Sequence, residues 1–313
     1  MDRQITNTVL MVEPVAFGFN KETAVNNYFM QENQLLGESE MQELAHSEFQ
    51  QMVEILQKSG VRVIVSKDTM SPHKPDSIFP NNWISFHYGR RIALYPMFAE
   101  NRRSERRKEV VNEVNKTGYA FTEVVDYSIY ENEQRFLEGT GSMILDRVNR
   151  IAYAALSERT NETLFKWFCN DFGFRPVIFH AMQSVNGKRM PVYHTNVALS
   201  IGEDFAVVCS DCIDAPEEKE LLLQTIEESG KKVIKITEKQ MQSFAGNVLQ
   251  LENVKGEKLL IMSATAYSSL EKIQLEMFRK INRLVVVPVP TIERYGGGSV
   301  RCMMAEVFGE RIN

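Results

Sequence analysis

The sequence predicts an α/β protein in which five similar modules are arranged around an axis as a pseudo-symmetric propeller. The first observation is a recurring pattern: a polar or glycine-rich opening segment, two apolar strands, a helix and a third strand. The second is the spacing, since 56 residues separate Asn82 from Glu138 and Glu138 from His194, and 52 separate His194 from Gly246 and Gly246 from Gly298. The third is that the two ends of the chain each supply part of one module. Alternating strands and helices indicate the α/β class, and a fixed repeat period is typical of radial architectures.

The elements of the modules follow from apolar periodicity. The opening segments with their first two strands are expected at residues 79–96, 137–156, 193–210 and 244–263, and a last opening with a single strand at 295–308. The helices are expected at residues 103–117, 161–172, 215–229 and 268–282, with third strands at 175–179, 232–236 and 284–288.

The fifth module is divided between the two ends of the chain. Residues 299–307 are expected to form a strand beside residues 8–13, and the helix over 41–59 carries an apolar stripe of Leu44, Met52, Ile55 and Leu56. A strand at 61–66 completes the module. This closure removes exposed sheet edges. Because no Pro-, Gly- or Ser-rich linker interrupts the pattern, residues 1–313 are expected to form a single domain.

Composition excludes several classes of protein. The net charge is −5, whereas a nucleic-acid binder needs a basic face. No apolar run approaches the roughly 18–20 residues that a membrane span requires. The first residues lack the features of a signal peptide. Four cysteines are too few for a disulfide scaffold of this length. We therefore expect a cytoplasmic protein with reduced thiols and with neither nucleic acid nor membrane as a partner.

In a radial repeat the opening segments meet at one end of the axis, which would bring together Cys302, His194 and Glu138. A thiol, an imidazole and a carboxylate are the parts of a nucleophilic site. Cys302 would attack the central carbon of a planar C–N group as a thiolate. His194 would protonate the departing nitrogen and later activate water. Glu138 would hold substrate nitrogens by accepting hydrogen bonds, and would in addition raise the basicity of the imidazole.

The chain resembles the guanidine-modifying superfamily of arginine deiminases, agmatine deiminases, dimethylarginine dimethylaminohydrolases and amidinotransferases. The matching pieces are TVLMVEP, FPNNW, LEGTGS, YHTN and GGGSVRCM, and they span nearly the whole sequence. The resemblance implies the five-module fold called a pentein, with Cys302 as nucleophile, His194 as acid and base, and Glu138 as the carboxylate. It implies no metal and no organic cofactor.

Two departures from the family bear on the substrate. Several members have aspartates, which grip a guanidinium cation, where this chain has Asn82 and Asn196. An amide offers a donor as well as an acceptor and can therefore match a neutral urea. The favoured substrate is a citrulline-like ureido amino acid, cleaved with release of ammonia. The alternatives are an arginine or dimethylarginine hydrolase, an amidinotransferase that passes the group to an amine, and a non-enzymatic propeller that binds the ribosome.

Other residues near the opening segments carry secondary expectations. Asn81 would bind substrate or serve as a turn residue, Asp76 would reach the substrate's amino group, and Arg301 would meet its carboxylate or point away. Cys209 and Cys212 are interpreted as structural, because zinc needs four ligands and no second pair exists. The basic run Arg102, Arg103, Arg106, Arg107 and Lys108, interleaved with Glu105 and Glu109, predicts a solvated helix face. The pattern is compatible with a homo-oligomer.

Overall fold

The computed structural model describes residues 3–31 and 36–312. Within these residues, strands form five three-stranded sheets and one two-stranded hairpin. In each three-stranded sheet the first two strands are antiparallel, and the third lies parallel to the second. A parallel partner needs a crossover connection, and in each module a helix provides it.

The five modules follow the chain, except that the fifth uses both ends. Module I contains β3 (Ile84–His87), β4 (Arg91–Leu94), α3 (Lys108–Lys116) and β5 (Glu123–Asp126). Module II contains β6 (Met143–Asp146), β7 (Ile151–Ala155), α5 (Glu162–Phe172) and β8 (Arg175–Phe179). Module III contains β11 (Leu199–Ile201), β12 (Phe205–Val208), α7 (Pro216–Glu228) and β13 (Lys232–Lys235). Module IV contains β14 (Leu249–Glu252), β15 (Lys258–Ser263), α9 (Ala264–Ser269), α10 (Lys272–Arg279) and β16 (Arg283–Val287). Module V contains β17 (Ala305–Glu306), β1 (Thr8–Glu13), α2 (Glu38–Lys58) and β2 (Arg62–Lys67).

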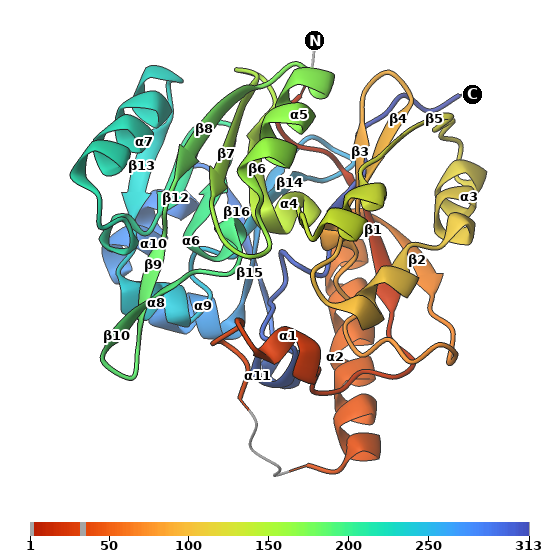
Figure 1. The fold of residues 1–313 in the computed structure, drawn as a ribbon. Coiled ribbons are helices and arrows are strands. Elements are labelled where there is room, and N and C mark those ends of the chain that lie inside the picture. Colours follow the sequence, from red (N-terminus) through yellow and green to blue (C-terminus); the bar gives the residue numbers. More distant parts are fainter. Residues whose placement is uncertain (1–2, 32–35, 313) are drawn as a thin grey trace.

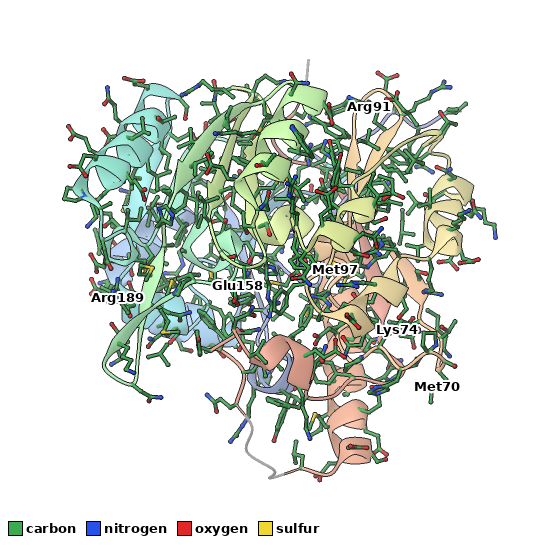
Figure 2. The ribbon with its side chains drawn as sticks, in the orientation of Figure 1. Met70, Lys74, Arg91, Met97, Glu158 and Arg189 are labelled. Atoms are coloured by element: carbon green, nitrogen blue, oxygen red, sulfur yellow. The ribbon has the colours of Figure 1, made fainter. Side chains whose placement is uncertain are left out.

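Short helical turns precede the first strands of three modules. They are η1 (Pro80–Asn82), α4 (Gly139–Ser142) and α6 (Thr195–Ala198). The remaining elements are α1 (Lys21–Ala24), η2 (Glu100–Glu105), η3 (Ser128–Glu133), η4 (Ser210–Cys212), α8 (Glu238–Gln242), α11 (Pro290–Gly296) and the hairpin β9 (Met182–Val185) with β10 (Lys188–Pro191). The hairpin carries Arg189, which lies far from the centre of the molecule in Figure 2. The sequence pattern did not predict this hairpin.

The modules surround a central axis, with strands inside and helices outside. The first strands of neighbouring modules contact each other, as β17 does with β3, and β11 does with both β6 and β14. Helices α2, α3 and α7 lie at the periphery (Figure 1). This arrangement places the segments that precede the first strands near the axis.

Helix α5 illustrates how the sequence specifies an outer helix. Asn161 caps its start by accepting a hydrogen bond from the backbone N–H of Leu164 at 3.1 Å, and Gly173 ends it with φ of 69°. Phe165, Phe168 and Phe172 recur at intervals of three and four residues and are buried. Each buried phenyl ring contributes about 1.5–3 kcal/mol relative to an exposed one.

Three expectations about local structure were wrong. Only Ala305–Glu306 of residues 299–307 is a strand. The residues before it form a turn, because the backbone N–H of Cys302 donates to the carbonyl of Ser299 at 2.9 Å and that of Met304 donates to the carbonyl of Arg301 at 3.3 Å. The helices expected at 103–117 and 268–282 are each interrupted, giving η2 with α3 and α9 with α10. Leu44 is 41% exposed, and the buried stripe of α2 instead runs through Met41, Ala45, Phe49, Met52 and Leu56.

No helix in the described part of the chain combines the length and apolar character that crossing a bilayer requires. The two ends of the chain are joined by hydrogen bonding, since β1 pairs with β17 on one side and β2 on the other. Because the last module cannot form without both ends, we propose that the chain folds as one domain.

Candidate active site

The segments that open the modules form the walls of one buried cavity. About 260 Å³ of space in it and at its mouth is not filled by atoms, and Cys302, His194 and Asn82 line it. Its full lining is Thr23, Asn27, Asp76, Phe79, Asn82, Arg102, Arg159, Tyr193, His194, Gly296, Gly298 and Cys302. Residues more than 100 positions apart in sequence therefore meet here, as the repeat predicted for the thiol and the imidazole.

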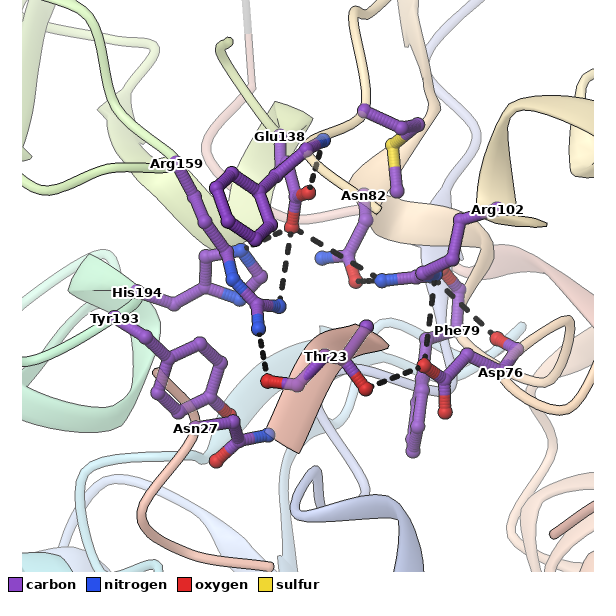
Figure 3. Close-up of polar contacts among 12 residues, drawn as sticks. Thr23, Asn27, Asp76, Phe79, Asn82, Arg102, Glu138, Arg159, Tyr193 and His194 are labelled. Atoms are coloured by element: carbon purple, nitrogen blue, oxygen red, sulfur yellow. Dashed lines mark hydrogen bonds and ion pairs between the residues drawn. The ribbon is translucent and has the colours of Figure 1, made fainter. Parts of the chain in front are cut away.

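Glu138 lies behind His194 and forms a pair with it. The imidazole Nε2 and the carboxylate Oε2 are 2.7 Å apart, and both side chains are buried (Figure 3). Because an ionised carboxylate only accepts hydrogen bonds, Nε2 carries the proton. The other carboxylate oxygen accepts the backbone N–H of Phe98 at 2.9 Å. This arrangement leaves His194 Nδ1 as the nitrogen that can exchange a proton with another group.

Two buried arginines flank the carboxylate of Glu138. Its Oε2 lies 3.5 Å from Arg159 Nη1 and 4.0 Å from Arg102 Nη1. Burial opposes ionisation, but Arg159, the hydrogen bond from His194 and Arg102 outweigh it and lower the pKa of Glu138 to about 2. Burial also lowers the pKa of His194 to about 4, although Glu138 acts in the other direction. At neutral pH the pair is therefore an ionised carboxylate and a neutral imidazole.

Arg102 is a residue of this site, so the prediction of a solvated basic helix face was wrong at that position. Arg102 is 2% exposed and lies in η2. Its Nε and Nη2 donate to the carboxylate of Glu105, three residues further on, at 2.9 and 3.0 Å. Its Nη1 donates to Asn82 Oδ1 at 2.9 Å, and its Nε lies 3.9 Å from Asp76 Oδ2. The spacing of Arg102 and Glu105 was the available sequence signal, since residues three apart share one side of a 3₁₀ turn.

The amide of Asn82 is oriented by its neighbours. Its oxygen is occupied by Arg102, and its Nδ2 donates to Asn81 Oδ1 at 3.2 Å. Asn82 therefore presents an N–H donor at the cavity wall. Asn81 is fully buried and does not line the cavity, so it supports Asn82 instead of reaching a ligand. Gly141 permits this packing, because a Cβ there would lie 2.5 Å from Asn82 Nδ2 and 2.8 Å from His194 Nδ1.

Asp76 lines the cavity next to the segment around α1. Its Oδ2 accepts hydrogen bonds from Asn20 at 2.7 Å and Thr23 at 3.0 Å, while its Oδ1 is buried without a partner among the described residues. Burial raises the pKa of Asp76, and Arg102 opposes that rise. An unpartnered buried carboxylate oxygen is the kind of group that a ligand's ammonium satisfies.

The segment around α1 covers the cavity, a role that the sequence did not reveal. Thr23 and Asn27 line the space, and Arg159 Nη2 donates to the carbonyl of Thr23 at 2.7 Å (Figure 3). The Nδ2 of Asn26 donates to the carboxylate of Glu158 at 2.7 Å. Glu158 lies near the centre of the view in Figure 2. The segment is thus fastened to module II.

Two asparagine amides surround the sulfur of Cys302. The Nδ2 atoms of Asn196 and Asn247 lie 3.4 and 3.3 Å from Sγ. Asn196 therefore contacts the thiol instead of lining the cavity, and Asn247 was missed. The glycine turn before Cys302 has Gly297 at φ 62°, and the Tyr193 hydroxyl holds its carbonyl at 2.6 Å.

Arg301 does not reach this cavity. It donates to Glu306 Oε2 at 2.8 Å and to the carbonyl of Met304 at 3.0 Å, and it lines a second cavity with Arg147 and Ser200. Of the two orientations considered, the structure shows the one pointing away, so the expected contact with a substrate carboxylate is not formed.

The remaining cysteines lie apart from the site. Cys209 and Cys212 belong to the core around β12, with Cys212 Sγ 3.3 Å from Met241 Sδ. Across residues 3–31 and 36–312, no group of three or more His, Cys, Asp or Glu side chains is placed to hold a metal ion.

Comparison with known proteins gives one family and a set of similar folds. A model of the family described as N,N dimethylarginine dimethylhydrolase, eukaryotic, matches residues 13–309. The structure superposes on the arginine dihydrolase ArgZ of the cyanobacterial ornithine-ammonia cycle with a TM-score of 0.73 and 18% identity, covering 97% of this chain but only 41% of that one. The N-terminal domain of ArgZ bound to product gives a TM-score of 0.72 at 18% identity, with 98% and 99% of the two chains covered.

A dimethylarginine dimethylaminohydrolase in adduct with S-methyl-L-thiocitrulline gives a TM-score of 0.62 at 16% identity, covering 96% of this chain and 99% of that one. At such identities the likeness concerns the fold, and it confirms the predicted five-module pentein. The chain spans about two fifths of whole ArgZ. Comparison with curated proteins finds none that matches.

Proposed function

Since the chain belongs to the family described as N,N dimethylarginine dimethylhydrolase, eukaryotic, we propose that it cleaves the ureido group of a citrulline-like amino acid. The family membership confirms the resemblance to guanidine-modifying enzymes and the prediction of a hydrolase acting on C–N bonds. Cys302 is the nucleophile, His194 the acid and base, and Glu138 the carboxylate that orients the imidazole. The observation that carries the choice of substrate is the orientation of Asn82.

Asn82 offers the cavity a donor, because Arg102 occupies its oxygen at 2.9 Å. A guanidinium group has only N–H donors and would meet another donor there, with the cation of Arg102 behind it. A ureido group has a carbonyl oxygen that can accept from Asn82. The carboxylate of Glu138 gives a guanidinium little extra attraction, since Arg159 already lies 3.5 Å from it. These contacts favour a neutral ureido carbon.

The amino-acid end of the substrate is assigned to Asp76. Asp76 lines the cavity, its Oδ1 has no partner among residues 3–31 and 36–312, and Asn20 and Thr23 hold the other oxygen in place. A substrate ammonium would complete this carboxylate with a charge-assisted hydrogen bond, which is roughly twice as strong as a neutral one.

The first half of the reaction begins with transfer of the Cys302 thiol proton to His194 Nδ1. The sulfur attacks the ureido carbon, a C–S bond forms, and the oxygen that receives the negative charge is held by the Asn82 amide. His194 then gives its proton to the terminal nitrogen, the C–N bond breaks, and ammonia leaves. Glu138 stabilises the transient imidazolium by accepting from Nε2. A neutral substrate brings no proton of its own, so this transfer needs the neutral imidazole that the buried site provides.

The second half hydrolyses the thiocarbamate on Cys302. Water gives one proton to His194 and attacks the same carbon, and the C–S bond breaks with return of a proton to sulfur. The released carbamic acid separates into an amine and carbon dioxide. For citrulline, the products are ornithine, ammonia and carbon dioxide, and one water is consumed.

Hydrolysis of arginine is the second candidate. It is favoured by Asp76, whose second oxygen is available to a cationic group, and by the likeness to the arginine dihydrolase ArgZ.

We also propose a cytoplasmic setting, with which the four free cysteines of the structure agree.

Release of ammonia from citrulline, arginine and agmatine, and of ammonia or methylamines from methylated arginines, tests the proposal. We expect citrulline to be turned over and Cys302→Ser to be inactive. Cys169→Ser serves as the matched control, since Cys169 is an equally buried cysteine in α5 outside the cavity. Turnover of arginine without turnover of citrulline would contradict the ureido assignment.

A further inference from the structure

Asn247 reaches the nucleophile because the residue before it is glycine. Gly246 packs so closely on module III that a Cβ there would lie 2.1 Å from the carbonyl oxygen of Val197. This contact brings the start of β14 against the turn of α6. Asn247 then extends from module IV toward Cys302 in module V and is fully buried.

Two contacts fix which way the Asn247 amide points. Its Nδ2 donates to the backbone carbonyl of Asn196 at 3.1 Å, and its Oδ1 accepts the backbone N–H of Arg301 at 3.1 Å. A backbone carbonyl can only accept and a backbone N–H can only donate. The amide therefore cannot be flipped without losing both bonds. Its second Nδ2 hydrogen is left for Cys302 Sγ at 3.3 Å.

The orientation of the Asn196 amide is not fixed in this way. Its Nδ2 lies 3.4 Å from the same sulfur, but its Oδ1 is buried without a partner in the described part of the chain. A flipped Asn196 would turn its oxygen toward the thiol instead. Of the two asparagines beside the nucleophile, Asn247 is thus the one whose donor is imposed by backbone groups of modules III and V.

We propose that Asn247 is a catalytic residue that stabilises the thiolate of Cys302 through a fixed N–H donor. A thiolate accepts strong hydrogen bonds, whereas a neutral thiol accepts only weak ones, so this donor favours the nucleophilic form. His194 is neutral in the free site and supplies no cation next to the sulfur. A neutral ureido substrate supplies none either. The inference rests on the proposed role of Cys302 as nucleophile.

Alkylation of Cys302 by iodoacetamide tests this directly, with the labelled Cys302 peptide quantified by mass spectrometry as pH is varied. Asn247→Asp is nearly isosteric and keeps the acceptor for Arg301, but it removes the donor and places a carboxylate beside the sulfur. We expect alkylation at neutral pH to slow by about tenfold and the pH of half-maximal rate to rise by about one unit. The folded fraction is measured by thermal unfolding. A folded Asn247→Asp with the rate and pH profile of the unmodified protein would overturn the proposal.

Asn282→Asp is the matched control, because it places the same charge at another buried asparagine, whose amide bonds to Gln250 and to the Phe278 carbonyl instead of the sulfur. We expect its alkylation profile to change by less than about twofold. Equal effects of both substitutions would point to a general effect of a buried carboxylate and would also overturn the proposal. Should Asn247→Asp not fold, Asn247→Ser removes the amide without adding charge and carries the same comparison. Since alkylation needs no substrate, the result holds even if citrulline is not hydrolysed.

Discussion

Replacing Glu138 with glutamine changes the proton position on His194. A glutamine can turn its NH₂ group toward Nε2 at the present 2.7 Å, which forces the imidazole proton onto Nδ1. His194 could then no longer accept the Cys302 proton. In a serine protease triad the equivalent carboxylate-to-amide change lowers kcat by about 10⁴, and we expect a loss of about 10³ to 10⁴ here. Steady-state ammonia release measures it, and a folded Glu138→Gln that keeps more than about a tenth of kcat would refute the tautomer argument.

The same substitution should also destabilise the protein, so a matched control is needed. Glu138→Gln leaves Arg159 and Arg102 without the carboxylate that lies 3.5 and 4.0 Å away, and breaking a buried ion pair costs about 3–5 kcal/mol. Asp146 is an equally buried carboxylate, paired with Lys231 at 3.2 Å and remote from the cavity. Asp146→Asn should lower the free energy of unfolding in urea by a similar amount while kcat per folded molecule stays within about twofold.

Three further substitutions test separate parts of the site. Asn82→Asp replaces the donor facing the substrate with an acceptor, so kcat/KM for citrulline relative to arginine should fall by at least about tenfold; an unchanged ratio would count against the ureido assignment. Gly141→Ala should lower kcat by about 100-fold, because its Cβ would lie 2.5 Å from Asn82 Nδ2, whereas Gly18→Ala has nothing within 4 Å and should be neutral. The pKa of His194 is lowered to about 4 from 6.5, so the unfolded state binds its proton first and the free energy of unfolding falls as pH drops from 6.5 to 4. Burial raises the pKa of Glu105 to about 7, so this group increases the free energy of unfolding as pH drops from 7 to 4.5 and opposes the effect of His194. Urea titrations of the parent and of His194→Gln at each pH give the difference that is due to His194. Parallel curves of free energy against pH would contradict the lowered pKa of His194.

The sequence predicted the five modules because each carries its own apolar periodicity and its own opening segment. The same regularity placed His194 and Cys302 at one cavity, with Glu138 directly behind the imidazole. It failed at residues 299–303, where apolar residues that favour a strand form the nucleophile's turn instead. Local pattern is commonly overridden at such sites, because function fixes a backbone that propensity would not choose.

The missed residues share a physical reason. Arg102 and Arg159 look like surface charges in sequence, and only tertiary packing reveals that buried carboxylates surround them. Thr23 and Asn27 belong to no repeat, so nothing in the pattern directed them to the cavity. Asn247 was within reach of sequence reasoning, since it directly follows Gly246, but its role depends on backbone groups of two other modules.

The charges around the cavity bear on the proposed substrate. Arg102 and Arg159 face three buried carboxyl groups, because Arg102 donates to Glu105 at 2.9 and 3.0 Å in addition to lying near Asp76 and Glu138. Burial raises the pKa of Glu105 to about 7 and also raises that of Asp76, so the charge of these two groups responds to a ligand. Citrulline is a zwitterion whose ammonium can meet Asp76 and whose ureido group is neutral. Arginine would bring a second cation to the wall formed by Asn82, which carries no charge, and an uncompensated buried charge costs several kcal/mol. This local mismatch supports the proposal of a ureido substrate.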